Sequence, residues 1–196
     1  MARSILRNMK RALIALLMCL CLPLVGADKE KPLPKDIPSL KVLVEKGDAR
    51  AQNELGRMYT KGQGVKQDHA EAVKRYRKAA LQGDAGAQYD LGVMYDIGEG
   101  VKQDFKEAMK WYRKAGEQGD AYGQYNLGRM YSKGQGVPHD DVTAYAWWNI
   151  AALSGHVGAK KFKGILAKKM TPKQIAKAEA LVKMMLKRNP KLLKSD

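Results

Sequence analysis

Apolar residues recur along most of the chain at the spacing of amphipathic helices. One stripe has members at positions i, i+4, i+7 and i+8, which places them on one face of a helix. It consists of Ala51, Leu55, Met58 and Tyr59. A second stripe with similar spacing follows and consists of Ala72, Tyr76, Ala79 and Ala80. The pattern therefore predicts two helices joined by a short turn.

Glycine and acidic residues mark the ends of these two helices. Gly62 stands where helices commonly end in a left-handed residue, and Gly64 supplies a second turn position. Asp68 and Glu71 have the spacing of a capping box at the start of the second helix. Gly56 lies inside the first helix, where glycine costs about 1 kcal/mol relative to alanine. We expect a neighbouring helix to approach the backbone closely at Gly56.

The whole unit is repeated. Gly47-Asp48-Ala49 recurs at Gly83 and again at Gly119, each time after 36 residues, and the first two copies are identical at 23 of 36 positions. The sequence therefore predicts repeats at 47–82, 83–118 and 119–154. Because no single unit can bury both of its apolar faces, the units must stack. The expected fold is an all-α solenoid of 36-residue helix-turn-helix repeats.

Both ends of the array are predicted to carry capping elements. A lone helix within Ile37–Lys46 is expected to cover the first repeat, with its capping part at 39–46. A fourth copy begins at Gly155 and soon departs from the pattern, so 155–196 is interpreted as a degenerate repeat with a basic C-terminal capping helix. Thr171-Pro172-Lys173-Gln174 has the residues of a helix start. One face of the helix that follows carries Ile175, Ala178, Val182, Met185 and Leu186.

The N-terminal 27 residues have the layout of a secretory signal. Four Lys or Arg residues are followed by the apolar run Ala12–Leu22 and by small residues ending at Ala27. An uncleaved anchor is the alternative. Residues 28–38 contain three prolines and are expected to form an extended linker. The mature protein is thus predicted to be exported, to the periplasm or else to the cell surface or medium, and to contain no cysteine.

The formal charge of +16 is unevenly distributed. Residues 155–196 hold 12 Lys and Arg against two acidic residues, whereas 28–154 are nearly neutral. The C-terminal helix could be a solvated cap, or it could dock electrostatically on acidic protein, lipid headgroups or envelope polymers. Nucleic acid is not expected as a partner, because no recognition motif accompanies the lysines. The candidate docking surface consists of Lys173, Lys177, Lys183 and Lys187.

No catalytic, metal-binding or cofactor-binding residues are predicted. The three histidines, His69, His139 and His156, do not form a metal-binding pair such as HxxxH and are expected at the surface or in turns. The Gly-x-Gly turns do not continue into a phosphate-binding loop.

Aromatic residues that recur at one phase of the repeat are expected in the core. One such position holds Tyr59, Tyr95 and Tyr131, and another holds Tyr76, Tyr112 and Trp148. Trp111 and Trp147 neighbour the second position and are expected to be partly exposed.

Residues that vary between the copies suggest a binding groove. They lie at i, i+3 and i+7 of each first helix, on a face away from the packing stripe. Tyr and Arg among them are residues that often anchor interfaces. An ordinary solvated face is the alternative. The groove candidates are Arg50, Asn53, Arg57, Gly86, Tyr89, Val93, Tyr122, Tyr125 and Arg129.

The repeated motif resembles a known family. Gly-Asp-x-x-x-Gln-x-x-Leu-Gly-x-Met-Tyr, followed by a Gly-x-Gly-Val turn and Asp-x-x-x-Ala, is similar to the Sel-one-like repeat, a branch of the tetratricopeptide-like arrays, over about 37–188. The resemblance implies a right-handed α-solenoid whose first helices line a concave face, and a role in protein–protein interaction. Bacterial members are often exported, and some are linked to host-cell interaction. An envelope hydrolase of the lactamase or peptidoglycan-processing type is the alternative that the resemblance implies.

Overall fold

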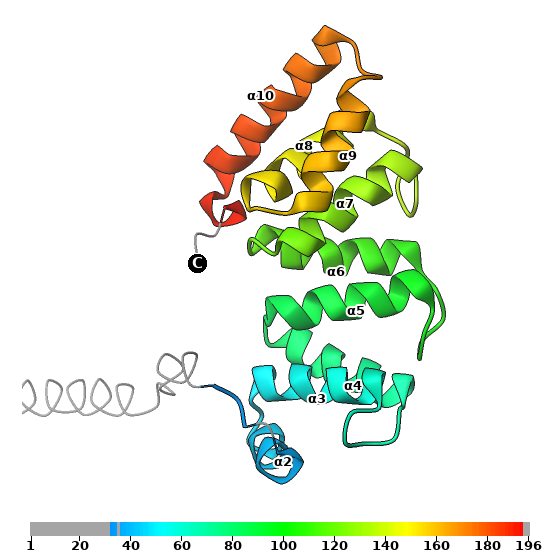
Figure 1. Ribbon diagram of the computed structural model, residues 1–196, viewed down its shortest axis with the longest axis vertical. Coiled ribbons are helices and arrows are strands. Elements are labelled where there is room, and N and C mark those ends of the chain that lie inside the picture. The colour runs from blue at the N-terminus through cyan, green and yellow to red at the C-terminus, as the bar shows by residue number, and fades with distance from the viewer. Residues whose placement is uncertain (1–31, 35, 194–196) are drawn as a thin grey trace, which may run out of the picture. The chain divides into compact units, whose positions relative to one another are not determined.

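The computed structural model describes residues 32–34 and 36–193, and all regular structure within them is helical (Figure 1). The chain divides into two units, Met1–Leu33 and Pro34–Asp196, and all of the described helices lie in the second. The predicted signal peptide and most of the linker lie outside the described residues. None of the described helices is long and apolar enough to cross a bilayer. The helices are α2 (Ile37–Glu45), α3 (Ala49–Lys61), α4 (His69–Leu81), α5 (Ala85–Ile97), α6 (Phe105–Glu117), α7 (Ala121–Lys133), α8 (Asp141–Leu153), α9 (Val157–Ala167), α10 (Pro172–Arg188) and the 3₁₀ helix η1 (Pro190–Leu192).

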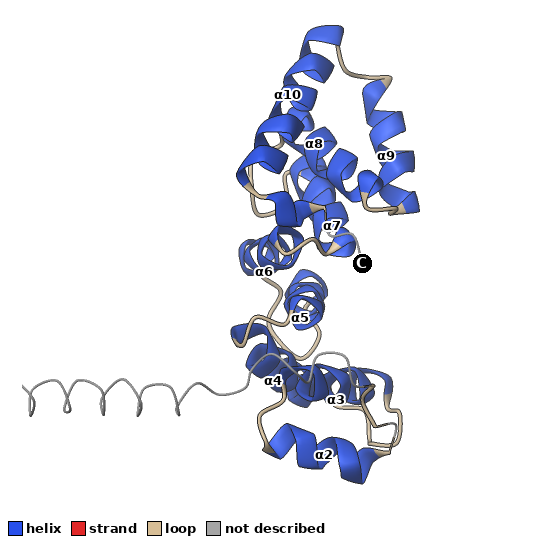
Figure 2. Cartoon of the chain, turned by 90° about the vertical axis from the view of Figure 1, so that its left-hand side faces the viewer, coloured by secondary structure: helices blue, strands red, loops and turns tan. Residues whose placement is uncertain are grey.

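Six of these helices form three repeated pairs. Helix α3 packs on α4, α5 on α6 and α7 on α8, and α4–α5 and α6–α7 contacts join successive pairs. Figure 2 shows the first helices of the pairs on one side of this stack and the second helices on the other. One core cluster joins Tyr76 of α4, Leu91 of α5 and Trp111 of α6, so each pair completes the core of its neighbour. The predicted all-α repeat fold is confirmed.

The first helices have the same ends in each copy. The Asp48 carboxylate accepts the N–H of Ala51 at 2.8 Å, and Gly62 ends the helix in the left-handed conformation at φ +67°. Asp84 with Gly98, and Asp120 with Gly134, repeat this arrangement. The glycine termini that the sequence predicted are therefore confirmed.

The second helices form only half of the predicted capping box. The Asp68 carboxylate accepts the N–H of Glu71 at 2.9 Å. The Asp68 N–H, however, donates to the Tyr59 carbonyl at 3.0 Å, so it is not available to the Glu71 side chain. Glu71 pairs instead with Arg75, one turn later on the same helix. The same arrangement occurs at Asp104, and the full box predicted for these two helices is wrong.

The glycines inside the first helices lie beneath aromatic rings. A Cβ atom built on Gly56 would stand 2.6 Å from Cε1 of Tyr76, which comes from the second helix of the same pair. The close approach predicted for these glycines is confirmed, and so is the burial of the aromatic residues above them. The corresponding pairs are Gly92 with Tyr112 and Gly128 with Trp148.

Two aromatic predictions need correction. Trp111 and Trp147 are only 9% and 3% exposed, because neighbouring helices cover both rings. Tyr95, by contrast, is half-buried at the edge of the core, and its hydroxyl accepts a hydrogen bond from Arg77 of the preceding repeat at 2.6 Å. Its repeat equivalents Tyr59 and Tyr131 are likewise half-buried.

The N-terminal capping helix α2 begins at Ile37, the first residue of the predicted helical span Ile37–Lys46. Pro38 therefore lies in its first turn and not in the extended linker expected over 28–38. Proline is favoured there because it lacks an N–H that the first turn would leave unpaired. The Asp36 side chain caps the helix by accepting the N–H of Ser39 at 2.8 Å. The Ile37 side chain extends to Gly64, where it packs against the first turn of the array.

The C-terminal helices do not form a fourth pair. Helix α9 follows α8 as a first helix would, but α10 packs on α8 and not as the partner of α9. In Figure 2, α8 lies between α9 and α10. Thr171 and Gln174 form the predicted capping box at the start of α10, and Ala178 and Val182 are the buried members of its predicted apolar face.

After α10 the chain folds back on an earlier repeat. The Leu192 side chain is 2% exposed and joins the core cluster of α6, α7 and α8. Its carbonyl accepts a hydrogen bond from Gln124 Nε2 at 2.8 Å. Asn189 donates to the carbonyl of Glu117 at 2.8 Å. The last described residues thus fasten α10 to the third and second repeats.

The composition of α8 explains where α10 packs. Ala146 and Ile150 of α8 are fully buried, and the core cluster that holds them also holds Val182 of α10. The equivalent positions in the earlier repeats hold lysines, which are solvated: Lys74 and Lys78 in α4, and Lys110 and Lys114 in α6. Helix α8 is therefore apolar on two faces and needs a cover on its outer side.

Candidate interaction face

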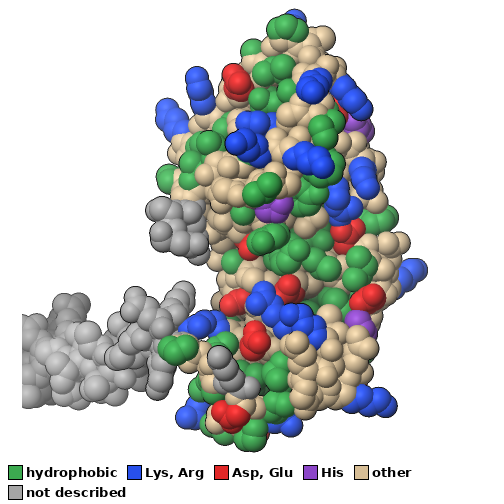
Figure 3. All heavy atoms as spheres, in the orientation of Figure 1, with side chains coloured by type: hydrophobic (Ala, Val, Ile, Leu, Met, Phe, Trp, Pro, Cys, Tyr) green, Lys and Arg blue, Asp and Glu red, His purple; other side chains and the backbone are tan. Residues whose placement is uncertain are grey.

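The predicted groove residues lie on the first helices α3, α5 and α7, on the side of the stack that Figure 3 views. Hydrophobic side chains gather near the middle of this side, and Lys and Arg side chains become frequent toward the C-terminal end. The groove candidates include a polar group, Asn53 and Arg57 of α3 with Arg129 of α7, and an aromatic group on α5 and α7.

The polar group connects the first two repeats. Arg57 Nε donates to Asp90 Oδ2 at 2.7 Å, and Asn53 Nδ2 donates to Asp84 Oδ1 at 3.3 Å. Burial raises the pKa of Asp90, and the nearby Arg57 guanidinium only partly offsets this effect. Gly86 gives room for this contact, because a Cβ there would stand 3.0 Å from Asn53 Nδ2. These side chains are used mainly to join the repeats.

Arg129 performs the same task between the third and second repeats. Its guanidinium pairs with Asp96, which also accepts the Tyr112 hydroxyl at 3.1 Å. The Arg129 guanidinium also donates to Asn126 Oδ1 at 3.2 Å and to Gln135 Oε1 at 3.0 Å. Val93, also predicted to line the groove, is half-buried against the core cluster of α6, α7 and α8.

The aromatic group is continuous and includes a histidine. The Tyr89 and Tyr122 rings lie 5.7 Å apart, and the Tyr122 ring meets His156 edge-on at 5.0 Å. Tyr125 stacks on His156 at 4.6 Å with an interplanar angle of 16°. Tyr122 is the most exposed of the four, at 59%. We call Tyr89, Tyr122, Tyr125 and His156 the aromatic face.

His156 also forms the N-cap of α9. Its Nδ1 accepts the N–H of Ala159 at 3.0 Å, which requires Nδ1 to be unprotonated. Burial lowers the pKa of His156, and this favours the neutral ring that the cap needs. The sequence predicted only a surface or turn histidine. Its position, 36 residues after the capping Asp120, is the signal that identifies it as a cap.

The other two histidines lie apart, His69 at the start of α4 and His139 in the connection before α8. His69 Nδ1 is 2.9 Å from Glu99, and His139 Nε2 is 3.0 Å from Asp141. Within residues 32–34 and 36–193, no group of three or more His, Cys, Asp or Glu side chains is arranged to hold a metal ion.

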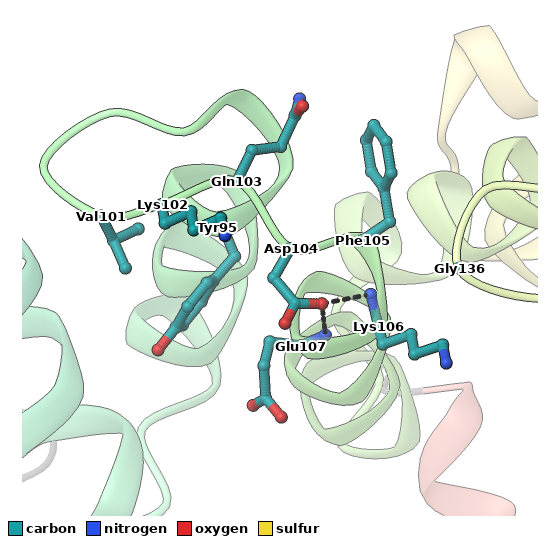
Figure 4. Close-up of a pocket in the computed structure, with 9 residues that line it drawn as sticks. All are labelled: Tyr95, Val101, Lys102, Gln103, Asp104, Phe105, Lys106, Glu107 and Gly136. Atoms are coloured by element: carbon teal, nitrogen blue, oxygen red, sulfur yellow. Dashed lines mark hydrogen bonds between the residues drawn. The ribbon is translucent and has the colours of Figure 1, made fainter.

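A cavity of about 650 Å³ lies beside the start of α6 (Figure 4). Tyr95, Val101, Phe105 and Gly136 contribute to its wall. The Asp104 carboxylate at its edge accepts the N–H groups of Lys106 and Glu107 at 2.9 and 3.0 Å, as the dashed lines show. That carboxylate is therefore engaged as a helix cap.

Comparison with known proteins identifies the repeats. Residues 49–84, 85–120 and 121–156 each match the Sel1 repeat. The chain belongs to the Sel1 repeat family. No curated protein matches it.

Two solved structures of Sel1-repeat type are similar to this chain. One is c5321, a protective antigen present in uropathogenic Escherichia coli strains, with 36% identity and a TM-score of 0.74. The match covers 81% of this chain but only 36% of c5321, so this chain spans about a third of that protein. The other is a Sel1 repeat protein from Oxalobacter formigenes, with 41% identity, a TM-score of 0.61, and coverage of 67% of this chain and 98% of that protein.

The excess of basic over acidic residues in this Sel1-repeat protein lies in its C-terminal part, where residues 155–196 hold 12 Lys and Arg against two acidic residues. Lys173, Lys177, Lys183 and Lys187 are exposed on α10, as their spacing predicted. Within the described part of the chain, no ion pair involves these four lysines. The surface is thus available for an anionic partner, and its role as a docking surface stays a prediction.

Proposed function

We propose that this protein is an exported Sel1-repeat scaffold that binds another protein or a peptide through the aromatic face. The observation that supports this most is the exposure of Tyr122 beside Tyr89 and His156. Tyrosine offers a large contact area and a polar tip at low entropic cost, which makes it a frequent anchor in interfaces.

The surrounding contacts favour a rigid binding surface. Arg57 and Arg129 tie adjacent first helices together through Asp90 and Asp96, so the aromatic face rests on a fixed frame. Because this surface is already ordered, binding a partner costs less entropy than binding to a mobile loop would. This refines the predicted groove: Arg57 and Arg129 hold the repeats together, and the tyrosines make the contact.

Export and the cellular setting are part of the same proposal. The basic start and the apolar run Ala12–Leu22 support secretion across a membrane, with the periplasm as the destination. One of the similar structures, c5321, is a protective antigen of uropathogenic strains, and this supports exposure to a host as the alternative setting. The basic C-terminal helix would steer an acidic partner, or an anionic envelope surface, toward the array.

In-cell crosslinking tests the aromatic face directly. A photo-crosslinking amino acid replaces Tyr122 in one strain, and in the control strain it replaces Leu81, which is 71% exposed at the end of α4. We expect a discrete adduct at position 122 that is absent at position 81, with its protein identified by mass spectrometry. Purified Tyr122→Ala should then lose capture of that protein while its circular dichroism is unchanged. Equal adducts at both positions would refute the proposal.

The enzyme alternative is tested on the same mature protein. Turnover of nitrocefin or of purified muropeptides separates an envelope hydrolase from a scaffold. We expect no turnover above that of a heat-denatured sample.

A further inference from the structure

Helix α9 has the position of a first helix, but no second helix of its own repeat packs on it. Gly164 follows Gly128 after 36 residues, so it holds the same position in the repeat. In the three complete pairs this glycine lies under a ring, and a Cβ would stand 2.5–2.7 Å from it. At Gly164 a Cβ would meet nothing within 4 Å. The place that Trp148 fills beside α7 is therefore open beside α9.

The chain's own α10 is not built to fill this place. The connection from α9 to α10 is the four residues Lys168–Thr171, whereas Gly62–Asp68 provides seven in a complete repeat. The apolar face of α10 is already buried on α8. Helix α10 also carries five Lys and Arg against the single acid Glu179, so it would meet the lysines of α9 with like charge.

The open side of α9 combines apolar and basic residues. Lys160, Gly164 and Lys168 are exposed, although the equivalent Gln124, Gly128 and Ser132 are buried or half-buried. Val157 is 82% exposed and Ile165 is 44% exposed. The sequence has no Asp or Glu between Gly155 and Ala178. We call Val157, Lys160, Lys161, Gly164, Ile165 and Lys168 the open stripe.

We propose that the open stripe binds an acidic amphipathic helix of another protein, which takes the place of the missing second helix. A large side chain of that helix would lie over Gly164, as Trp148 lies over Gly128. Its carboxylates would meet Lys160 and Lys168. The proposal does not depend on the aromatic face, which lies on other residues.

The spacing of the lysines defines the partner further. Lys160 and Lys168 are eight residues apart, which is about 12 Å along a helix. Gly164 lies midway. A helix that runs alongside α9 matches both lysines if it carries Glu at i and i+8 and an aromatic residue at i+4. A second copy of this protein is a poor match, because its α10 is basic.

Fluorescence anisotropy with designed peptides tests this match. The probe is a labelled, end-capped helical peptide with the pattern Glu-x₃-Tyr-x₃-Glu. One control peptide has Lys in place of both Glu residues, and another has Ala in place of Tyr. We expect the first peptide to bind at least about tenfold more tightly than either control, and its binding to weaken as salt is raised.

Two protein variants locate the binding on α9. Gly164→Phe should weaken binding of the Glu-Tyr-Glu peptide by about tenfold or more, because the added ring occupies the place of the partner's side chain. The open surroundings of Gly164 mean that the variant should fold normally, which circular dichroism checks. We expect peptide binding to be abolished in the double variant Lys160→Glu, Lys168→Glu. Most of the binding should remain in the matched α10 variant Lys173→Glu, Lys187→Glu.

Three results would overturn the proposal. They are no binding of the Glu-Tyr-Glu peptide, equal binding of all three peptides, or an equal loss from the α9 and α10 charge variants. Binding of the open stripe to phosphatidylglycerol vesicles with none to the peptide would assign it to a lipid surface instead. Failure of Tyr122→Ala to affect partner capture would leave these results unchanged, so the two proposals are tested separately.

Discussion

Trp148 lies so close over Gly128 that a Cβ on the glycine would stand 2.5 Å from Cδ1 of the indole. The indole Nε1 also donates to the Tyr125 carbonyl at 3.0 Å, which fixes the ring in that place. The glycine thus allows two helices to approach at a distance that no side chain permits.

The first prediction compares this glycine with its open equivalent. Gly128→Ala should lower the free energy of unfolding by about 1–3 kcal/mol, because the methyl group forces Trp148 aside. Gly164→Ala should raise it by about 0.5–1 kcal/mol, because alanine favours the helix and nothing opposes its Cβ. Urea melts of the two variants measure both values. A loss of stability in Gly164→Ala would contradict the open position of α9.

The second prediction concerns the C-terminal residues. Leu192→Ala should destabilise the protein by about 2–5 kcal/mol, because the side chain is buried in the core cluster of α6, α7 and α8. Leu193→Ala is the matched control, since that side chain is 39% exposed and should matter little. Thermal and urea unfolding give the comparison. Similar effects from the two leucines would show that the segment does not pack on the array.

The third prediction addresses the pair between the first two repeats. Arg57→Ala leaves the mostly buried carboxylate of Asp90 without its cation and should cost about 1–2 kcal/mol, a value reduced by the partial exposure of Arg57. Adding Asp90→Asn removes that charge and should recover part of the loss. A double-mutant cycle on urea melts yields the coupling energy, and a value near zero would mean that the pair does not join the repeats.

The fourth prediction is a pH dependence that originates at His156. Burial lowers its pKa in the folded protein, so the unfolded chain takes up the proton first as the pH falls. The free energy of unfolding should therefore be fully retained above about pH 6.5 and decrease below it. Protonation of Nδ1 would also break the cap on Ala159.

His156→Asn isolates this effect. Asparagine is a good N-cap that does not titrate, so the variant should lose the part of the pH dependence below about pH 6.5 that belongs to this histidine. Chemical denaturation at several pH values measures the slope for both proteins. An identical slope in wild type and His156→Asn would assign the dependence to other groups.

Most of the local structure could be read from the sequence. The 36-residue period, the apolar stripes and the turn glycines such as Gly62 depend on residues within one or two turns of one another. Those interactions are the same in each copy, so the residues responsible for them recur every 36 positions and can be recognised in the sequence. The candidate binding face was located in the same way, from positions that vary at a constant phase of the first helices.

The roles of those positions follow from contacts between helices. Arg129 and Tyr122 stand on the same variable face, yet one pairs with Asp96 to join repeats and the other is exposed beside His156. No periodic signal separates these roles, because each depends on which side chains of the next helix come within reach.

The repeats, their helices and the glycines that end the first helices follow from short-range spacing, so the amino-acid sequence was enough to predict them. The packing of α10 on α8, which leaves α9 open, became clear only from the folded molecule. That choice depends on contacts such as Gln124 with Leu192, which are 68 residues apart and occur once. Ala146 and Ile150 of α8 indicate in the sequence that this helix needs a second cover, since a helix with two apolar faces requires two neighbours.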